Sequence, residues 1–117
     1  MKRRSMQRVK REGGAANHHC VYVVLLDDDA RQLSRARKAT SGKPCVYVGM
    51  TGLTPEERFE NHKKGVKAAR VVKKFGERLL PELYEHLNPM PYEAALAMEA
   101  DLAEDLRSDG YCVFGGH

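Results

Sequence analysis

Hydrophobic residues gather in two short runs in the first half of the chain, and both open with the tetrapeptide Cys-Val-Tyr-Val. Residues 20–26 and 45–48 are rich in valine and tyrosine, which favour β-strands. Tyr22 and Tyr47 occupy the same place in their runs and share strand parity with Cys20 and Cys45. All four are therefore predicted to face one side of a sheet, toward the helices.

The segment between these strands, residues 27–43, is too long for a hairpin and is interpreted as an insertion. Its opening aspartates can cap a short helix that runs to about residue 38. Residues 1–17 show no apolar periodicity and contain Gly13 and Gly14, which predicts a flexible basic tail before a single domain at 18–117.

The clearest helix start is at Thr54, followed by proline at the first helical position and by Glu57 to close a capping box. This helix is expected to end at Gly65. Later elements are predicted as a helix at 67–75, a weak edge strand at 80–87, a long helix from 91 to 108 and a short strand at 111–114. The order predicts an α+β domain with a three-stranded, largely antiparallel sheet flanked by helices.

The chain has 117 residues, 31% charged and 42% hydrophobic, as is usual for one globular domain. Its longest apolar run is far below the roughly 20 residues that cross a bilayer. No apolar segment follows the basic N-terminus, so a secretory signal is not expected. A cytoplasmic protein without membrane contact is predicted.

Positive charge is concentrated in two places, although the net charge is only +4. One is the tail. The other follows the first predicted helix, where Lys63, Lys67, Arg70 and Lys74 would share a face if the two helices were roughly in line. Such patches suit a polyanion, although solvated basic surface is an equally good interpretation of either alone.

The three cysteines include no CxxC pair, which argues against a disulfide framework or a structural zinc site. They are interpreted as buried thiols. His18, His19 and Cys20 are adjacent, but adjacent histidines at the end of a tail are more often incidental than metal ligands.

Glu99 is the one acid on the apolar side of the last helix when residues are placed at about 100° each. Tyr92, Ala95, Leu102, Ala103 and Leu106 are expected on the same side. A buried carboxylate is costly unless a metal or cation compensates it, so Glu99 is a candidate Mg²⁺ ligand. The alternatives are a structural ion pair with Arg58 and a position at the edge of the apolar side, where water reaches the carboxylate.

Arg58 and His62 are four residues apart and should project from one side of their helix. An arginine fork suits a phosphate oxygen, and histidine can relay a proton near neutral pH. Tyr22 and Tyr47 could act as bases only if a nearby cation or metal lowered their pKa from about 10. Gly49, without a side chain, could let a phosphate or a backbone come close.

The ordered set Cys20-Val21-Tyr22, Tyr47-Val48-Gly49, Arg58, His62 and Glu99 resembles the GIY-YIG nuclease superfamily over about residues 21–113. The resemblance implies an endonuclease that cuts DNA phosphodiesters with one divalent metal, Mg²⁺ or another such as Mn²⁺, held by Glu99. It further implies that Arg58 binds the scissile phosphate, while Tyr22, Tyr47 and His62 position or deprotonate the attacking water.

Cys20 stands where the family motif has glycine, and the separation of the two tyrosines is longer than in most members. Two classes of function remain from the sequence. One is a metal-dependent endonuclease acting on branched, damaged or foreign DNA. The other is a nucleic-acid-binding module of the same fold that does not cleave.

Overall fold

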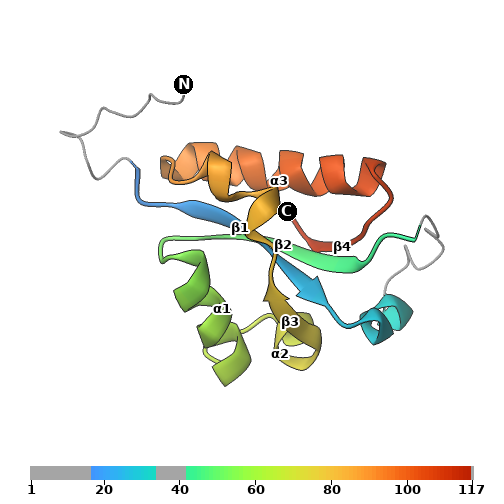
Figure 1. Ribbon diagram of the computed structural model, residues 1–117. Coiled ribbons are helices and arrows are strands. Elements are labelled where there is room, and N and C mark those ends of the chain that lie inside the picture. The colour runs from blue at the N-terminus through green and yellow to red at the C-terminus, as the bar shows by residue number, and fades with distance from the viewer. Residues whose placement is uncertain (1–16, 34–41, 117) are drawn as a thin grey trace.

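A single four-stranded sheet organises the computed structural model, which describes residues 17–33 and 42–116. Its strands are β1 (Cys20–Leu26), β2 (Cys45–Thr51), β3 (Gly76–Leu79) and β4 (Cys112–Gly115), in the order β3-β1-β2-β4. β1 is antiparallel to both β2 and β3, whereas β2 and β4 are parallel. In Figure 1, α3 (Tyr92–Ser108) lies above the strands, and α1 (Pro55–Lys64) and α2 (Arg70–Phe75) lie below them.

The α+β class is confirmed, but the prediction of three strands is wrong. Residues 112–115 pair with β2 and add a fourth, parallel strand. The edge strand beside β1 is Gly76–Leu79 and not residues 80–87, which instead form two short 3-10 helices, Pro81–Leu83 and Glu85–Leu87. Pro81 has no backbone N–H to donate to a ladder and begins the first of these turns.

The strand β2 also continues through Gly49 to Thr51, beyond the predicted strand at residues 45–48. Gly49 is the cross-strand partner of Tyr22 and therefore belongs to the ladder. Between β1 and β2, the expected helix begins as a 3-10 helix at Asp28–Leu33, and residues 34–41 of the insertion lie outside the described residues. The tail at 1–16 lies outside them too.

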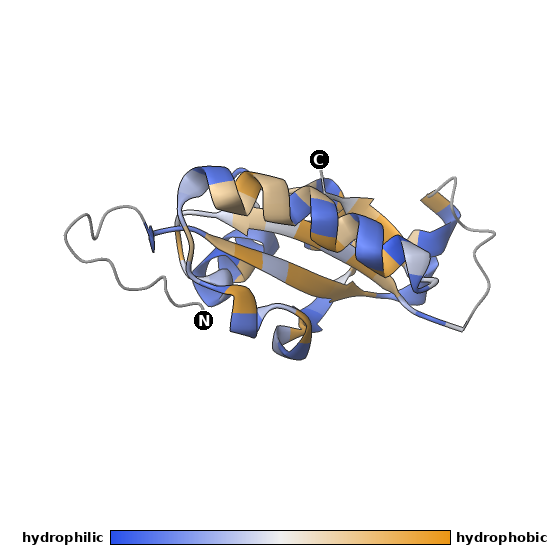
Figure 2. Cartoon of the chain, turned by 90° about the horizontal axis from the view of Figure 1, so that it is seen from above, coloured by the Kyte–Doolittle hydropathy of each residue, from blue (hydrophilic) through white to orange (hydrophobic). Residues whose placement is uncertain are grey.

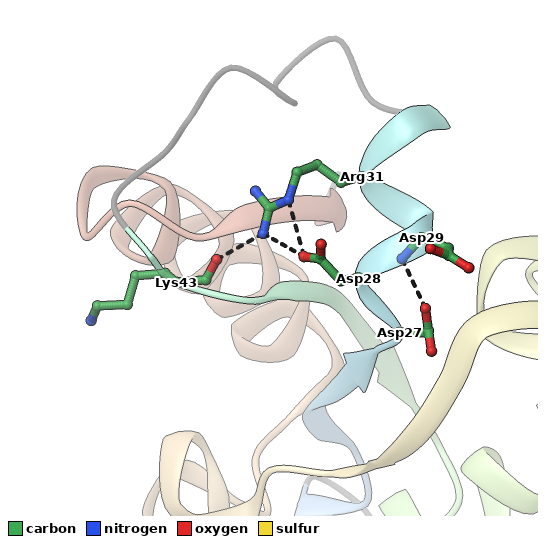
Figure 3. Close-up of polar contacts among 5 residues, drawn as sticks. All are labelled: Asp27, Asp28, Asp29, Arg31 and Lys43. Carbon is green, nitrogen blue, oxygen red and sulfur yellow. Dashed lines mark hydrogen bonds and ion pairs between the residues drawn. The ribbon is translucent and has the colours of Figure 1, made fainter.

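Arg31 links the two ends of the insertion between β1 and β2. Its guanidinium donates to the Asp28 carboxylate at 2.9 Å and to the backbone carbonyl of Lys43 at 3.0 Å (Figure 3). Beside it, Asp27 accepts from the backbone N–H of Asp29 at 2.8 Å. These local bonds bring the end of β1 and the start of β2 together, so the insertion leaves the β1–β2 register undisturbed.

The start of α1 is as predicted. Thr54 accepts from the backbone N–H of Glu57, and the Glu57 side chain accepts from the N–H of Thr54. Gly65 ends the helix in the left-handed conformation, with φ 87°, that a residue with a Cβ adopts reluctantly. α2, by contrast, begins at Arg70 and not at residue 67. The long helix begins at Tyr92 and ends at Ser108.

Four consecutive residues of β1, Val21 to Val24, are buried, so both faces of this strand are covered. Figure 2 shows hydrophobic residues along the strands and a mixed pattern on α3. Cys45 and Cys112 are buried partners across the β2–β4 ladder, as expected of buried thiols, whereas Cys20 is only half-buried. No helix in the described residues is long and apolar enough to span a membrane.

The side chain of Asn88 completes the edge of β1 beyond β3. It accepts from the backbone N–H of Val21 at 2.9 Å and donates to the Val21 carbonyl at 2.8 Å. The Asn88 amide thus takes the place of a neighbouring strand at Val21. On one side of it along β1, the Leu80 N–H donates to the Val23 carbonyl, and on the other side His19 and Met90 form a β-bridge. Asn88 therefore anchors the residue before Tyr22.

We predict that Asn88→Ala lowers the free energy of unfolding by about 1–3 kcal/mol, because both backbone groups of Val21 lose a partner in a partly buried place. Asn61→Ala is the control, since it removes the same amide from another partly buried position, on α1. Urea unfolding measures both. Equal stability of the two variants would contradict the anchoring role.

Candidate functional site

Tyr22 and His62 form the buried centre of the candidate site. The Tyr22 hydroxyl oxygen lies 2.8 Å from Nε2 of His62, which joins β1 to α1. The other ring nitrogen, Nδ1, accepts from the backbone N–H of Ala69 at 3.0 Å. His62 is completely buried and Tyr22 is 1% exposed. Packing therefore holds both rings, and hydrogen bonds hold His62 at both of its ring nitrogens.

Tyr47 lies beside this pair, as its strand parity predicted. Its ring centroid is 6.3 Å from that of Tyr22 and 5.7 Å from that of His62. The register explains the arrangement, because Tyr22 faces Gly49 and Tyr47 faces Val24, which places the two phenols diagonally on one face. Tyr47 is less buried than Tyr22 and lies at the more open side of the cluster.

Gly49 has a steric role in this arrangement. A Cβ at this position would lie 2.6 Å from the Tyr22 hydroxyl oxygen and 2.7 Å from the adjacent ring carbon. Gly49 was expected to let a phosphate or a backbone come close, and the group that comes close is the Tyr22 ring. The Tyr22 ring can occupy its place in the cluster because Gly49 has no side chain.

Glu99 is the acid that α3 brings to the tyrosines. It is 8% exposed, and Ala95, Leu102, Ala103 and Leu106 are buried with it, as the helical periodicity predicted. Tyr92 departs from that prediction, since it is 53% exposed and packs edge-on against His19. Burial raises the pKa of Tyr47 and of Tyr22, and the negative charge of Glu99 raises both further.

Arg58 is half-buried and its guanidinium is oriented by the loop between α1 and α2. It donates to the carbonyls of Val66, at 3.3 Å, and Lys67, at 2.8 Å. Its positive charge lowers the pKa of His62 and opposes the raised pKa of both tyrosines. Arg58 and His62 therefore act on the same cluster from one helix, as their spacing predicted.

Burial dominates the electrostatics of the cluster. It raises the pKa of Tyr22 and Tyr47 above the usual value for a phenol and, with the charge of Arg58, lowers the pKa of His62 to about 4. At neutral pH the two phenols and the imidazole are uncharged. The cluster therefore needs an added cation if a phenol is to lose its proton near pH 7.

Glu99 fits one divalent metal better than it fits a multi-ligand centre. Within 17–33 and 42–116 no group of three or more histidine, cysteine, aspartate or glutamate side chains is placed to bind a metal. Magnesium commonly uses one or two carboxylates and keeps several waters. A single carboxylate whose charge acts on two neutral phenols matches that donor chemistry.

The basic residues do not share one continuous helix face. Lys63 donates to the carbonyls of Lys73 and Gly76, at 3.2 and 2.8 Å, so α2 folds back beside the end of α1. The condition for a shared face, two helices roughly in line, is not met, because Gly65 and the loop after it reverse the chain. Arg70, Lys73 and Lys74 instead line an open hollow on α2, and Lys67 is exposed in the loop.

No protein-family model, curated protein or solved structure matches this chain. Its interpretation therefore rests on the geometry of the described residues. Two groups that hold the site in place could not be predicted from the sequence: the backbone N–H of Ala69 and the side chain of Asn88. The first is a main-chain group and leaves no signal in residue type. An isolated asparagine before a proline gives no hint of a partner 67 residues away.

We predict that Gly49→Ala destabilises the protein by about 1–3 kcal/mol, because the added methyl overlaps the Tyr22 phenol. Gly52→Ala is the control, since a Cβ there meets only the His19 ring, at 3.4 Å and beyond. Thermal unfolding of both variants tests the steric role. Similar melting temperatures would show that the Tyr22 ring moves aside without cost.

We also predict that the free energy of unfolding falls by about 2 kcal/mol between pH 7 and pH 5 through His62 alone. The pKa of His62 is about 4 in the folded protein and about 6.5 when unfolded, so the unfolded chain binds more protons in this range. The stability is present above pH 6.5 and is lost as the pH falls toward 4.

Urea titrations of the protein and of His62→Gln at both pH values isolate this contribution, because the variant keeps every other titrating group. The difference in stability between pH 7 and pH 5 should be smaller in the variant. An unchanged pH dependence would place the titrating group elsewhere.

Proposed function

We propose that this protein is a cytoplasmic endonuclease of GIY-YIG-like fold that hydrolyses DNA phosphodiester bonds with one divalent metal, Mg²⁺ or Mn²⁺, at Glu99. One observation carries the proposal. Two phenols, an imidazole, a guanidinium and a carboxylate from β1, β2, α1 and α3 act on one another in one cluster. These groups are the ones that phosphodiester hydrolysis needs for proton transfer, charge stabilisation and metal binding.

Arg58 is proposed to bind the scissile phosphate. The Arg58 guanidinium has five N–H donors. Two are used on the Val66 and Lys67 carbonyls and the side chain also hydrogen-bonds Tyr22, which leaves others for a phosphate oxygen. Since the two carbonyls orient the group before substrate arrives, little reorganisation is needed as charge grows on the phosphate. Such prepared donors contribute most in the transition state.

Tyr22 and Tyr47 are proposed to position the attacking water and to take part in its deprotonation. Their neutral hydroxyls can orient a water through hydrogen bonds, and the charge of Arg58 favours loss of a phenolic proton. A divalent cation at Glu99 would stabilise negative charge on the phosphate. Glu99 would hold that cation.

The substrate is proposed to be DNA, branched, damaged or foreign. Lys67, Arg70, Lys74 and the neighbouring Lys73 present exposed positive charge around α2, suited to backbone phosphates. Lys63 contributes less to such contacts, because its ammonium group already binds two carbonyls. The basic tail would add sequence-independent attraction.

A binding module without cleavage is the second candidate, favoured by the burial that raises the pKa of both tyrosines and keeps them protonated at neutral pH. The two candidates differ in one requirement. Only the nuclease needs Glu99 and a metal, whereas both need the basic surface.

We predict that Glu99→Gln abolishes Mg²⁺-dependent cleavage of a branched DNA and leaves affinity for it within a few-fold, because the amide keeps the shape of the carboxylate but not its charge. Asp101→Asn, on the exposed side of the same helix, should cleave normally. Cleavage by the unaltered protein should stop with chelator. Binding without cleavage in any divalent metal would favour the second candidate, and full activity of Glu99→Gln would remove Glu99 from the chemistry.

A further inference from the structure

The loop between α1 and α2, residues 65–69, contacts both functional side chains of α1 through its backbone. The carbonyls of Val66 and Lys67 accept from Arg58, and the N–H of Ala69 donates to Nδ1 of His62. Lys67 has φ 47°, a left-handed conformation that is uncommon for a residue with a Cβ. Strained backbone of this kind persists where surrounding contacts require it.

The bond from Ala69 decides where the proton of His62 lies. A backbone N–H can only donate, so Nδ1 must offer a lone pair and cannot carry a hydrogen. The neutral ring therefore carries its hydrogen on Nε2. Since Nε2 lies 2.8 Å from the Tyr22 hydroxyl oxygen, His62 donates this bond and Tyr22 accepts it.

We infer that the backbone N–H of Ala69 is a positioning group that holds His62 as the Nε2–H tautomer, and that His62 serves Tyr22 as a hydrogen-bond donor and not as a base. The inference rests on the proposed function where it concerns catalysis. The direction of the hydrogen bonds stands without it.

Three consequences follow for the cluster. His62 has no lone pair left to take a proton from water. The hydroxyl proton of Tyr22 cannot point at His62, and is available to an acceptor elsewhere. When Tyr22 gives up that proton, the Nε2–H remains in place and its bond to the phenolate oxygen strengthens. Tyr22 is then the member of the pair that exchanges protons.

The surroundings of His62 agree with this assignment. Tyr22 from β1, Tyr47 from β2, Arg58 from α1 and the Ala69 N–H from the loop all face the ring. None of these groups is an anion at neutral pH. A second proton on the ring would place an N–H against the Ala69 N–H, in addition to the cost of burial.

The test is Ala69→Pro, which removes the N–H and puts the proline Cδ in its place, so that the His62 ring loses its donor and has to move away from residue 69. Ala69 has φ −71°, close to the value that proline requires, and the preceding Ala68 lies outside any helix. Ala69→Ser is the matched control, because it changes the side chain and keeps the N–H.

Nitrogen-15 NMR of the histidine ring reads the tautomer directly, without DNA or metal. The unaltered protein and Ala69→Ser should show His62 as the Nε2–H tautomer at pH 7. Ala69→Pro should show a mixture of tautomers and a pKa shifted upward. An Nδ1–H tautomer in the unaltered protein would overturn the inference, even if the proline variant does not fold, and so would an unchanged tautomer and pKa in a folded proline variant.

Cleavage assays test the catalytic consequence separately. At saturating DNA, Ala69→Pro should cut roughly tenfold to a hundredfold more slowly than Ala69→Ser, with DNA affinity within about twofold. Equal rates would mean that the Ala69 hydrogen bond is only structural, and would overturn the catalytic part of the inference. If the unaltered protein shows the Nε2–H tautomer but never cleaves DNA, the proposed function fails while the tautomer assignment stands.

Discussion

The contact between Tyr22 and Gly49 is the constraint on which the candidate site depends. A phenol can lie across the neighbouring strand only because the residue opposite has no side chain. With the ring in that place, its hydroxyl reaches His62 on α1, and Tyr47 fills the diagonal position beside it. The position of α1 relative to the sheet is therefore coupled to one glycine, and the register of β1 and β2 has to be kept to the residue. The bonds around Arg31 at the base of the insertion preserve that register.

Charge in the cluster is confined to its edges. Burial keeps the two phenols and the imidazole neutral, while Arg58 and Glu99 introduce opposite charges from α1 and α3. Arg58 makes loss of a phenolic proton easier and Glu99 makes it harder. A cation at Glu99 would cancel the second effect and leave the first. Proton loss from a buried tyrosine would thus depend on that cation.

The parts of the fold that follow from local chemistry could be predicted from the sequence. The capping box at Thr54, the left-handed Gly65 and the apolar side of α3 with Glu99 each depend on residues close together in the chain. The parallel pairing of β4 with β2 and the position of β3 could not, because both depend on which distant segments meet. Strand parity placed Tyr22 and Tyr47 on one face, and helical spacing placed Arg58 with His62. The reversal of α2 was missed, since Lys63 binds the end of α2 through carbonyls, which every residue has.

For the same reason, no sequence motif records the backbone groups that orient the side chains of the site. The groups that orient Arg58 and His62 are two carbonyls and one N–H of residues 66–69, and none depends on its own side chain. Their positions depend on where Gly65 ends α1 and on the left-handed Lys67. Changes of residue type in this loop should therefore be tolerated as long as its backbone path is kept. A change of one residue in its length would displace a guanidinium and an imidazole together, because both are bound to the same short segment.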